Sequence, residues 1–282
     1  MHVRSVLEGK YFLTDLTIQP GALSSSNDGP TKNKNATASS YGAVIGTFCP
    51  LDWRLQKKNP SSVPMFRDVV YQSHHCTPNR VTMDIRKIAE KARVYDRTPP
   101  VGNKPHSLAV GGFVFHESRC GSTLVSNLLA SASPERHRVY SESGPPLAVL
   151  RACEYKQCSK TKQQALLRDV VYLMGRSVSK RESHVFFKIQ SVGVKSIRVV
   201  TETFPTTPWI FVFRDSIETM MSHLKHLSET KRANCLRALD NPPPILEKLV
   251  KDSGRAMESL NRPEFCAAHL VRGSFFLLVS SV

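Results

Sequence analysis

The chain has 282 residues, of which 40% are hydrophobic and 22% charged, a balance that is ordinary for a globular protein. Lys and Arg outnumber Asp and Glu by 39 to 23, and the resulting net charge of +16 favours anionic partners. The basic residues are scattered without sustained blocks, which argues against a nucleic-acid interface and favours a solvated surface with one anion site.

The first third of the chain carries weak patterns. Residues 20–40 are rich in Ser, Asn, Gly and Pro without periodic apolar residues, so we expect a flexible N-terminal segment over residues 1–40, in which residues 1–19 either add a strand or are loosely attached. Residues 41–105 are denser in apolar residues, with helical spacing at 61–73 and 83–92. This region is expected to be helical and to lead into a core at residues 106–282.

A strand, a tight turn and a helix are predicted next. Residues 110–115 are apolar, aromatic and β-branched, as in a buried strand, and residues 124–130 have helical spacing. The polar turn at 118–123 contains Gly121, which lets the backbone approach a ligand closely, and Ser122, which adds a hydroxyl. Free N–H groups at a helix start attract anions. The turn is therefore a candidate anion site.

The turn differs from the nucleotide triphosphatase loop. That loop needs a Lys directly after its second Gly, whereas Ser122 follows Gly121 here. His116 stands where the first Gly would be, and the cation precedes the glycine as Arg119. We expect an anion at this turn, but not a magnesium-bound triphosphate.

A carboxylate at a strand end is the candidate base. Residues 138–140 favour a short strand, and the Gly-Pro-Pro at 144–146 is expected to continue neither a strand nor a helix, which holds Glu142 at the strand end. A solvated loop glutamate is an equally good interpretation. The apolar strand at 185–189 carries Lys188, which either faces the site or, more commonly, extends out of the sheet to solvent.

A second strand–helix junction follows. Residues 208–213 predict a strongly apolar strand, after which Arg214 stands at the strand end. Asp215 or Ser216 is suited to cap a helix that runs through Leu227. An arginine at such a point offers two parallel hydrogen bonds to an anion, although a purely structural arginine is the simpler interpretation when it is taken alone.

The two junctions together resemble the sulfotransferases. The run Ser118-Arg119-Cys120-Gly121-Ser122-Thr123-Leu124 is similar to the 5′-phosphosulfate loop of that family. Ser222 follows Arg214 by eight residues. In the family an arginine and a serine with the same spacing contact the 3′-phosphate. The resemblance covers about residues 109–270. It lacks the family's last cofactor loop, so either this branch has none or the gene product is truncated.

The resemblance implies a fold and an activity. It implies a sulfotransferase-like α/β domain over residues 41–282, a three-layer sandwich with a mainly parallel central sheet, similar to the P-loop nucleotide hydrolases. The implied reaction moves a sulfuryl group from 3′-phosphoadenosine 5′-phosphosulfate to a hydroxyl or amine of a small-molecule or carbohydrate acceptor, and leaves adenosine 3′,5′-bisphosphate. The implied catalytic residues are Arg119, Glu142 and, as a weaker candidate, His116. The implied cofactor-binding residues are Arg119, Cys120, Gly121, Ser122, Thr123, Arg214 and Ser222.

Two other classes of protein stay open. One is an inactive nucleotide-binding pseudoenzyme, and the other is a basic polyanion-binding protein. No run approaches the roughly 20 apolar residues of a membrane span and no signal peptide is evident, so cytoplasm is the default for an otherwise open location. The seven cysteines show no CxxC spacing, and His74-His75-Cys76 lacks partner ligands, so no metal site is expected.

Overall fold

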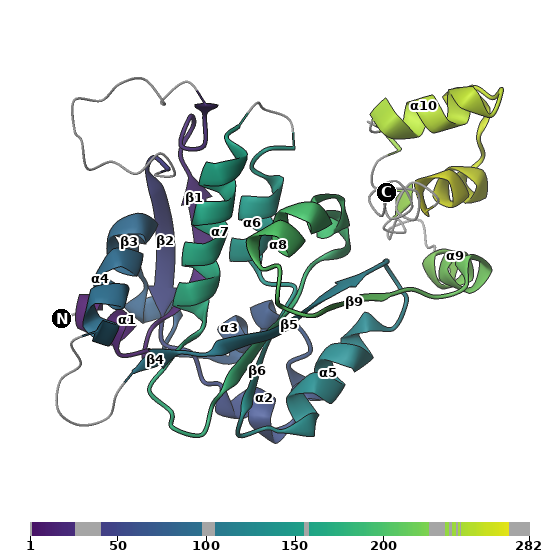
Figure 1. The fold of residues 1–282 in the computed structure, drawn as a ribbon. Helices are drawn as coiled ribbons and strands as arrows, with labels where there is room; N and C mark the ends of the chain where they lie inside the picture. The colour runs from purple at the N-terminus through teal and green to yellow at the C-terminus, as the bar shows by residue number, and fades with distance from the viewer. Residues whose placement is uncertain are drawn as a thin grey trace. The chain divides into compact units, whose positions relative to one another are not determined.

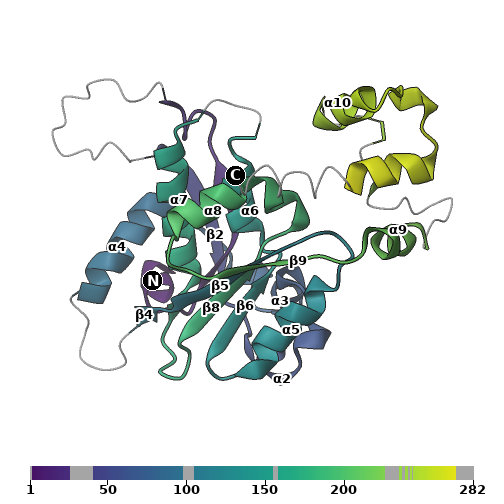
Figure 2. The same cartoon turned by 45° about the vertical axis from the view of Figure 1, so that its right-hand side comes forward.

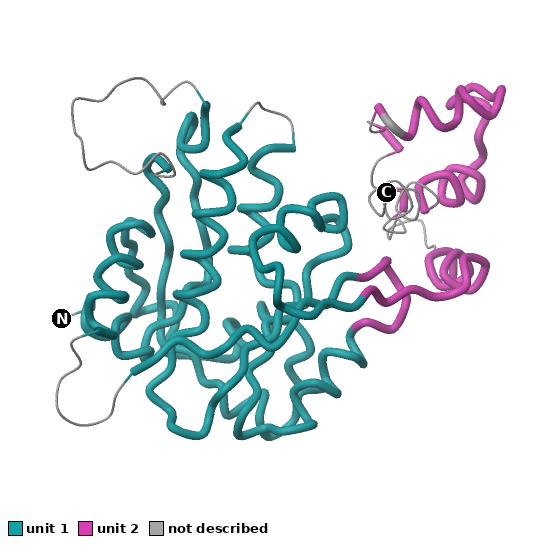
Figure 3. Tube along the Cα trace, in the orientation of Figure 1, with its two compact units in different colours: residues 1–115, 123–210 teal, residues 116–122, 211–282 magenta. Residues whose placement is uncertain are grey.

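The computed structural model describes residues 2–25, 41–97, 105–154, 158–225 and 244–270, together with residues 235, 236, 239, 240 and 242. The chain forms two compact units (Figure 3). Unit 1 comprises residues 1–115 and 123–210, and unit 2 comprises residues 116–122 and 211–282. The short turn 116–122 is grouped with a part of the chain that lies far later in the sequence.

Unit 1 contains most of the regular structure. The strands are β1 (Phe12–Ile18), β2 (Val44–Cys49), β3 (Val81–Asp84), β4 (His106–Ser107), β5 (Ala109–His116), β6 (His137–Ser141), β7 (Arg176–Ser177), β8 (His184–Lys188) and β9 (Trp209–Val212). The helices are α1 (His2–Leu7), α2 (Arg54–Lys58), α3 (Phe66–Gln72), α4 (Ile85–Arg97), α5 (Ser122–Ala132), α6 (Gly144–Arg151), α7 (Lys160–Met174) and α8 (Ile197–Thr203). Short 3-10 turns lie at Pro60–Ser62, Thr77–Asn79 and Ser191–Ser196.

A four-stranded, all-parallel sheet organises the fold. Its strand order is β6-β8-β5-β9, and β8 pairs with both β5 and β6. Figures 1 and 2 show α5 on one face of the sheet and α7 and α8 on the other. This arrangement confirms the predicted α/β class with a mainly parallel sheet. The carboxyl ends of parallel strands meet at one edge, where ligands bind in open α/β sheets.

Aromatic side chains align across the middle of this sheet. Phe187 of β8 is in register with Phe113 of β5 and with Tyr140 of β6. The ring centroids lie 5.8 Å and 5.3 Å apart, and Trp53 packs edge-on against Tyr140 at 4.9 Å. Each such pair contributes about 0.5–1.5 kcal/mol beyond the burial of its area. The row of rings holds the three strands in register.

The N-terminal region differs from the sequence-based expectation. Residues 2–25 include a helix and a strand, and β1 pairs antiparallel with β2, which pairs with β3. Of the two alternatives for residues 1–19, the strand is therefore the one present, and the region 41–105, expected to be helical, also contains β2 and β3; residues 26–40 lie outside the described part. The pairing of β1 with β2 joins segments far apart in sequence, which local composition does not register.

Helix α6 begins at the residues that were expected to break regular structure. Gly144, Pro145 and Pro146 form its first turn. Proline is tolerated there because the first N–H groups of a helix have no intrahelical acceptor and the ring presets a helical φ. As expected, Gly-Pro-Pro does not continue β6, which ends at Ser141, but its place at the start of a helix was not foreseen from the sequence. The consequence is that Glu142 lies between a strand end and a helix start.

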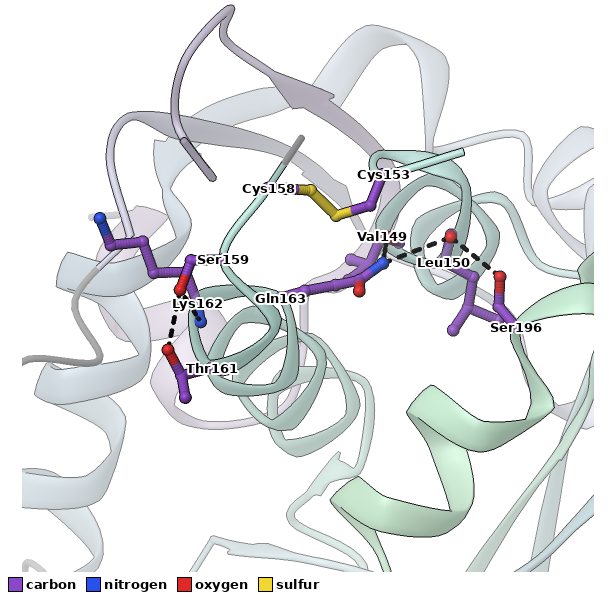
Figure 4. Close-up of a disulfide and its surroundings, with 9 residues drawn as sticks. All are labelled: Val149, Leu150, Cys153, Cys158, Ser159, Thr161, Lys162, Gln163 and Ser196. Carbon is purple, nitrogen blue, oxygen red and sulfur yellow. Dashed lines mark hydrogen bonds between the residues drawn. A yellow bond between two sulfur atoms is a disulfide. The ribbon is translucent and has the colours of Figure 1, made fainter. Parts of the chain in front are cut away.

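The far end of α6 is held in place by side chains of neighbouring helices (Figure 4). Gln163 Nε2 donates to the carbonyl oxygens of Val149 and Leu150, at 2.9 and 3.3 Å. Ser196 Oγ donates to the oxygen of Leu150 at 3.1 Å. These bonds satisfy carbonyl groups that the last helical turn leaves without partners. They anchor the helix that follows Glu142.

Six of the seven cysteines are paired, and Cys120 is the free one. The pairs are Cys49–Cys76, Cys153–Cys158 and Cys235–Cys266. The sequence spacing gave no hint of them, because disulfides join residues by spatial proximity. Disulfides are characteristic of proteins from oxidising compartments.

Unit 2 contains the turn 116–122, α9 (Ser216–Leu224), α10 (Pro244–Asp252), a 3-10 turn at Met257–Ser259 and a helix over residues 262–270. The predicted extension of α9 to Leu227 and the final GSFFLLVSSV lie outside the described residues. A small core is formed by Cys235, Leu236, Leu246, Val250, Phe265 and Cys266. Among the described helices of both units, none has the length and apolar character that crossing a membrane requires.

Candidate functional site

The predicted strand–turn–helix is present between β5 and α5. The backbone is left-handed at Arg119, with φ 65°, and at Gly121, with φ 88°. A left-handed backbone is unfavourable for a non-glycine residue and is concentrated at functional sites. No atom lies within 4 Å of the place that a Cβ on Gly121 would occupy, so the backbone there faces open space. The turn and the start of α5 at Ser122 form a cradle suited to an anion.

His116 and Cys120 shape the inside of this turn. The His116 ring is 4% exposed, and its Nδ1 lies 2.8 Å from the carbonyl oxygen of Glu117. Burial disfavours ionisation of Cys120, but hydrogen bonds from His116 and from the backbone of Ser122 outweigh it and lower the pKa of the thiol. The burial of His116 is better suited to holding the turn than to reaching a substrate.

The second predicted junction, between β9 and α9, is also present. Asp215 caps the helix, because its Oδ1 accepts from the backbone N–H groups of Ile217 and Glu218 at 2.9 and 3.1 Å. The start of α9 therefore already has its own carboxylate. Arg214 lies just before the cap, and its Nε donates to Glu218 Oε2 at 2.5 Å. Any anion at Arg214 must compete with this carboxylate.

Within unit 2, a residue of the turn 118–123 contacts a residue of α9. Arg119 Nε donates to Ser222 Oγ at 3.0 Å, although the two residues are 103 positions apart. Arg214, just before the cap of α9, contacts Glu218, and Ser222 lies four residues after Glu218 on the same stripe of the helix. One guanidinium thus lies at each end of this stripe of α9. The predicted 5′-phosphate and 3′-phosphate ligands adjoin one helix.

Two buried polar side chains of α9 lack hydrogen-bond partners among the described residues. Thr219 is 1% exposed and His223 is 5% exposed, and neither Thr219 Oγ1 nor His223 Nε2 has a partner there. The pKa of His223 is lowered by burial and by the positive charge of Arg119. Buried polar groups are normally hydrogen-bonded to protein or to ordered water, so these two atoms have capacity for a water or a ligand, and His223 lies within the electrostatic reach of Arg119.

Glu142 is the second non-glycine residue with a left-handed backbone, at φ 56°. Its Oε1 accepts from Lys188 Nζ at 2.6 Å, and its N–H donates to the Lys188 carbonyl oxygen at 2.8 Å. The Lys188 side chain is 1% exposed, so the interpretation that it extends to solvent was wrong. The Glu142 side chain is 25% exposed, so this anchored carboxylate can be reached from outside.

The predicted residues divide between the units. His116, Arg119, Cys120, Gly121, Ser122, Arg214 and Ser222 belong to unit 2, whereas Thr123 and Glu142 belong to unit 1. Sequence reasoning missed Thr219 and His223. Their spacing of four, with Ser222 between them, places them beside the predicted serine, and this helical periodicity was the available signal. It also missed the pairing of Lys188 with Glu142, which depends on the register of β6 and β8.

Metal and family comparisons add no further assignment. Within the described ranges, no group of three or more His, Cys, Asp or Glu side chains could hold a metal ion. The His74-His75-Cys76 run has no thiolate to offer, because Cys76 is bonded to Cys49. Comparisons with protein-family models, with curated proteins and with solved structures find no match to this chain.

Proposed function

We propose that the protein is a sulfotransferase that uses 3′-phosphoadenosine 5′-phosphosulfate, with a core related to the P-loop nucleotide hydrolases. The observation that carries the proposal is the hydrogen bond between Arg119 and Ser222, because it joins the two motifs that the sequence assigned to opposite ends of one nucleotide. The all-parallel sheet, with both junctions following its strands, supports the same proposal.

The residues around α9 fit such a nucleotide. Open space at Gly121 leaves room for a phosphate against the backbone of the turn. Thr219 Oγ1 and His223 Nε2 would gain a partner from an anion bound beside Arg119. A bisphosphate carries anionic groups at two separated positions, and Arg119 and Arg214 offer one cation for each.

Each residue then has a role. Arg119 neutralises charge on the 5′-phosphate, and Gly121, Ser122 and Thr123 hold this phosphate through N–H and hydroxyl donors. Arg214 and Ser222 anchor the 3′-phosphate. Glu142 takes the proton of the acceptor hydroxyl, and Lys188 keeps its carboxylate in one position. The donor supplies the sulfuryl group, so these residues position the reactants and stabilise charge.

A thermal-shift and calorimetric titration with adenosine 3′,5′-bisphosphate tests the proposal, with ATP and NAD as comparators. We expect the bisphosphate to raise Tm by binding the folded state, and Arg119→Ala and Arg214→Ala each to reduce the shift. Arg54→Ala is the matched control, because Arg54 is an exposed arginine that pairs with Asp52. Absence of a bisphosphate shift, or an unchanged shift in Arg119→Ala, would overturn the proposal.

A sulfate-transfer assay separates the remaining classes. Tight bisphosphate binding without transfer to any of a panel of acceptors would identify a pseudoenzyme. Salt-sensitive binding of nucleic acid that Arg119→Ala leaves unchanged would identify a general polyanion-binding protein.

A further inference from the structure

A cavity of about 400 Å³ lies beside Glu142 in unit 1. This volume falls within the roughly 300–1,000 Å³ of small-molecule sites. Elements from four parts of the chain contribute to it: β1, α3, the segment 73–80 that follows α3, and the turn before α6. Its lining residues are Thr14, Phe66, Arg67, Val70, Tyr71, Ser73, His74, Thr77, Arg80, Glu142 and Gly144. The candidate base is therefore part of the wall of a binding-sized cavity.

The charges of this wall are predominantly positive. Arg67 and Arg80 both line the cavity, and the Arg67 side chain is 83% exposed. The nearest carboxylate to Arg67 is that of Asp68, at 3.9 Å, and its other oxygen accepts from the N–H of Met65. No ion pair of Arg80 exists within the described ranges. Glu142, the acidic residue of the lining, is already paired with a buried lysine. The cavity thus attracts an anion.

The remaining surfaces of the cavity suit a ring. Phe66, which is 3% exposed, and Tyr71, which is 86% exposed, both line the cavity, so its wall is partly aromatic. The face of an aromatic ring carries partial negative charge, and the C–H groups of a sugar ring pack against such a face. An arginine recognises a carboxylate or sulfate through two parallel hydrogen bonds.

We infer that this cavity binds the acceptor and that the acceptor is an acidic oligosaccharide. The inference rests on the proposed function for the assignment of Glu142 as the base. A sugar hydroxyl gives its proton to Glu142, its oxygen forms the new bond to sulfur, and the bond from sulfur to the 5′-phosphate oxygen breaks with its electron pair on the leaving bisphosphate. Carboxylate or sulfate groups of the saccharide pair with Arg67 and Arg80, and Tyr71 packs against a sugar ring.

The test is calorimetric titration of the full chain with a hyaluronan tetrasaccharide, which carries carboxylates, beside the neutral chitotetraose. We expect the acidic saccharide to bind at least about ten-fold more tightly. Arg67→Ala and Arg80→Ala should each weaken this binding several-fold. Tyr71→Ala should weaken the binding of both saccharides. Arg54→Ala is the control, because Arg54 is about as exposed as Arg67 but does not line the cavity.

Three results would overturn the inference: equal affinity for the neutral saccharide, unchanged binding in Arg67→Ala and Arg80→Ala, or displacement of the saccharide by an acidic tyrosine peptide that binds more tightly. Binding of adenosine 3′,5′-bisphosphate is measured on the same variants and should not change. If the nucleotide fails to bind but the arginine-dependent saccharide binding is found, the proposed function fails and the cavity remains an acidic-saccharide site. If only the saccharide fails, the proposed function stands.

Discussion

Arg214 Nε and Glu218 Oε2 form an ion pair at 2.5 Å, four residues apart in the chain. The pair engages Arg214, which is proposed to bind the 3′-phosphate. Both side chains are about half exposed, so the pair is worth roughly 0.2–1 kcal/mol. Glu218→Gln should release Arg214 and increase the affinity for adenosine 3′,5′-bisphosphate by about two- to five-fold. Isothermal titration at low ionic strength measures this gain, which salt should reduce.

A matched control is available in the same unit. Glu264 pairs with Arg255 at 2.9 Å with comparable exposure, and Glu264→Gln removes the same charge without touching α9. Its nucleotide affinity should equal that of the unaltered chain. Equal gains in both variants would show a general charge effect and would contradict a phosphate site at Arg214.

His223 should couple nucleotide binding to pH. Its pKa lies below 6.5 in the free protein, because burial and Arg119 both disfavour the imidazolium. A phosphate bound beside it raises that pKa, so binding takes up a proton and the affinity increases as the pH falls through this range. The phosphate groups of the nucleotide also change protonation at about pH 6. His223→Gln serves as the reference, because it keeps this contribution of the nucleotide and removes that of His223. The affinity gain from about pH 8 to pH 6 should be smaller in His223→Gln.

Glu142→Gln should separate catalysis from nucleotide binding. Loss of the base should reduce sulfate transfer by about 100-fold or more, while the affinity for adenosine 3′,5′-bisphosphate stays unchanged. The same change leaves the buried ammonium of Lys188 without its charged partner, so stability to urea should fall by up to about 3 kcal/mol. Adding Lys188→Met should restore stability but not activity. Recovered transfer in the double variant would remove Glu142 from the role of base.

The buried pair Arg138–Glu182 should make the fold sensitive to acid. Burial alone would raise the pKa of Glu182, but Arg138, Ser177 and Lys57 more than offset it, so the pKa is lowered below 4.5. The pair's stabilisation is therefore complete above pH 4.5 and is lost as the pH falls through the lowered pKa. Arg138→Met should cost about 3–5 kcal/mol at neutral pH. In urea titrations the difference in free energy of unfolding between the unaltered chain and Arg138→Met should become smaller toward low pH.

The three disulfides and the free Cys120 predict the number of thiols that can be titrated. Denatured without reductant, the protein should show one free thiol, and after reduction it should show seven. In the folded state that single thiol, Cys120, should react with iodoacetamide faster than an ordinary cysteine near pH 7, because its pKa is lowered. Cys120→Ser is the control. Labelling at another cysteine in the native protein would contradict the pairing.

Local sequence signals predicted the core well. The strand and helix on either side of the turn 118–123, the helix α7 and the Asp215 cap all follow from periodicity and capping preferences. Arg119 and Ser222 were singled out from two distant motifs, but the direct hydrogen bond between them was not predicted.

The rest depended on interactions that sequence spacing does not encode. Residues that are separated in the chain come together in three ways: the pairing of β1 with β2, the disulfides, and the contact of Lys188 with Glu142 across neighbouring strands. The helical role of Pro145 and Pro146 was missed for a different reason. Proline was taken as a breaker of structure, although its position in the first turn decides whether it breaks a helix or starts one.

The left-handed backbone at Arg119 creates a trade-off between the thermal stability of the fold and the binding of an anion at the turn. Glycine accepts this conformation without steric penalty, so Arg119→Gly should make the chain more resistant to heat by about 1 kcal/mol while removing the cation from the turn. Directed evolution toward heat resistance alone would then tend to erase the arginine. Keeping it would require a selection that rewards recognition of the anion.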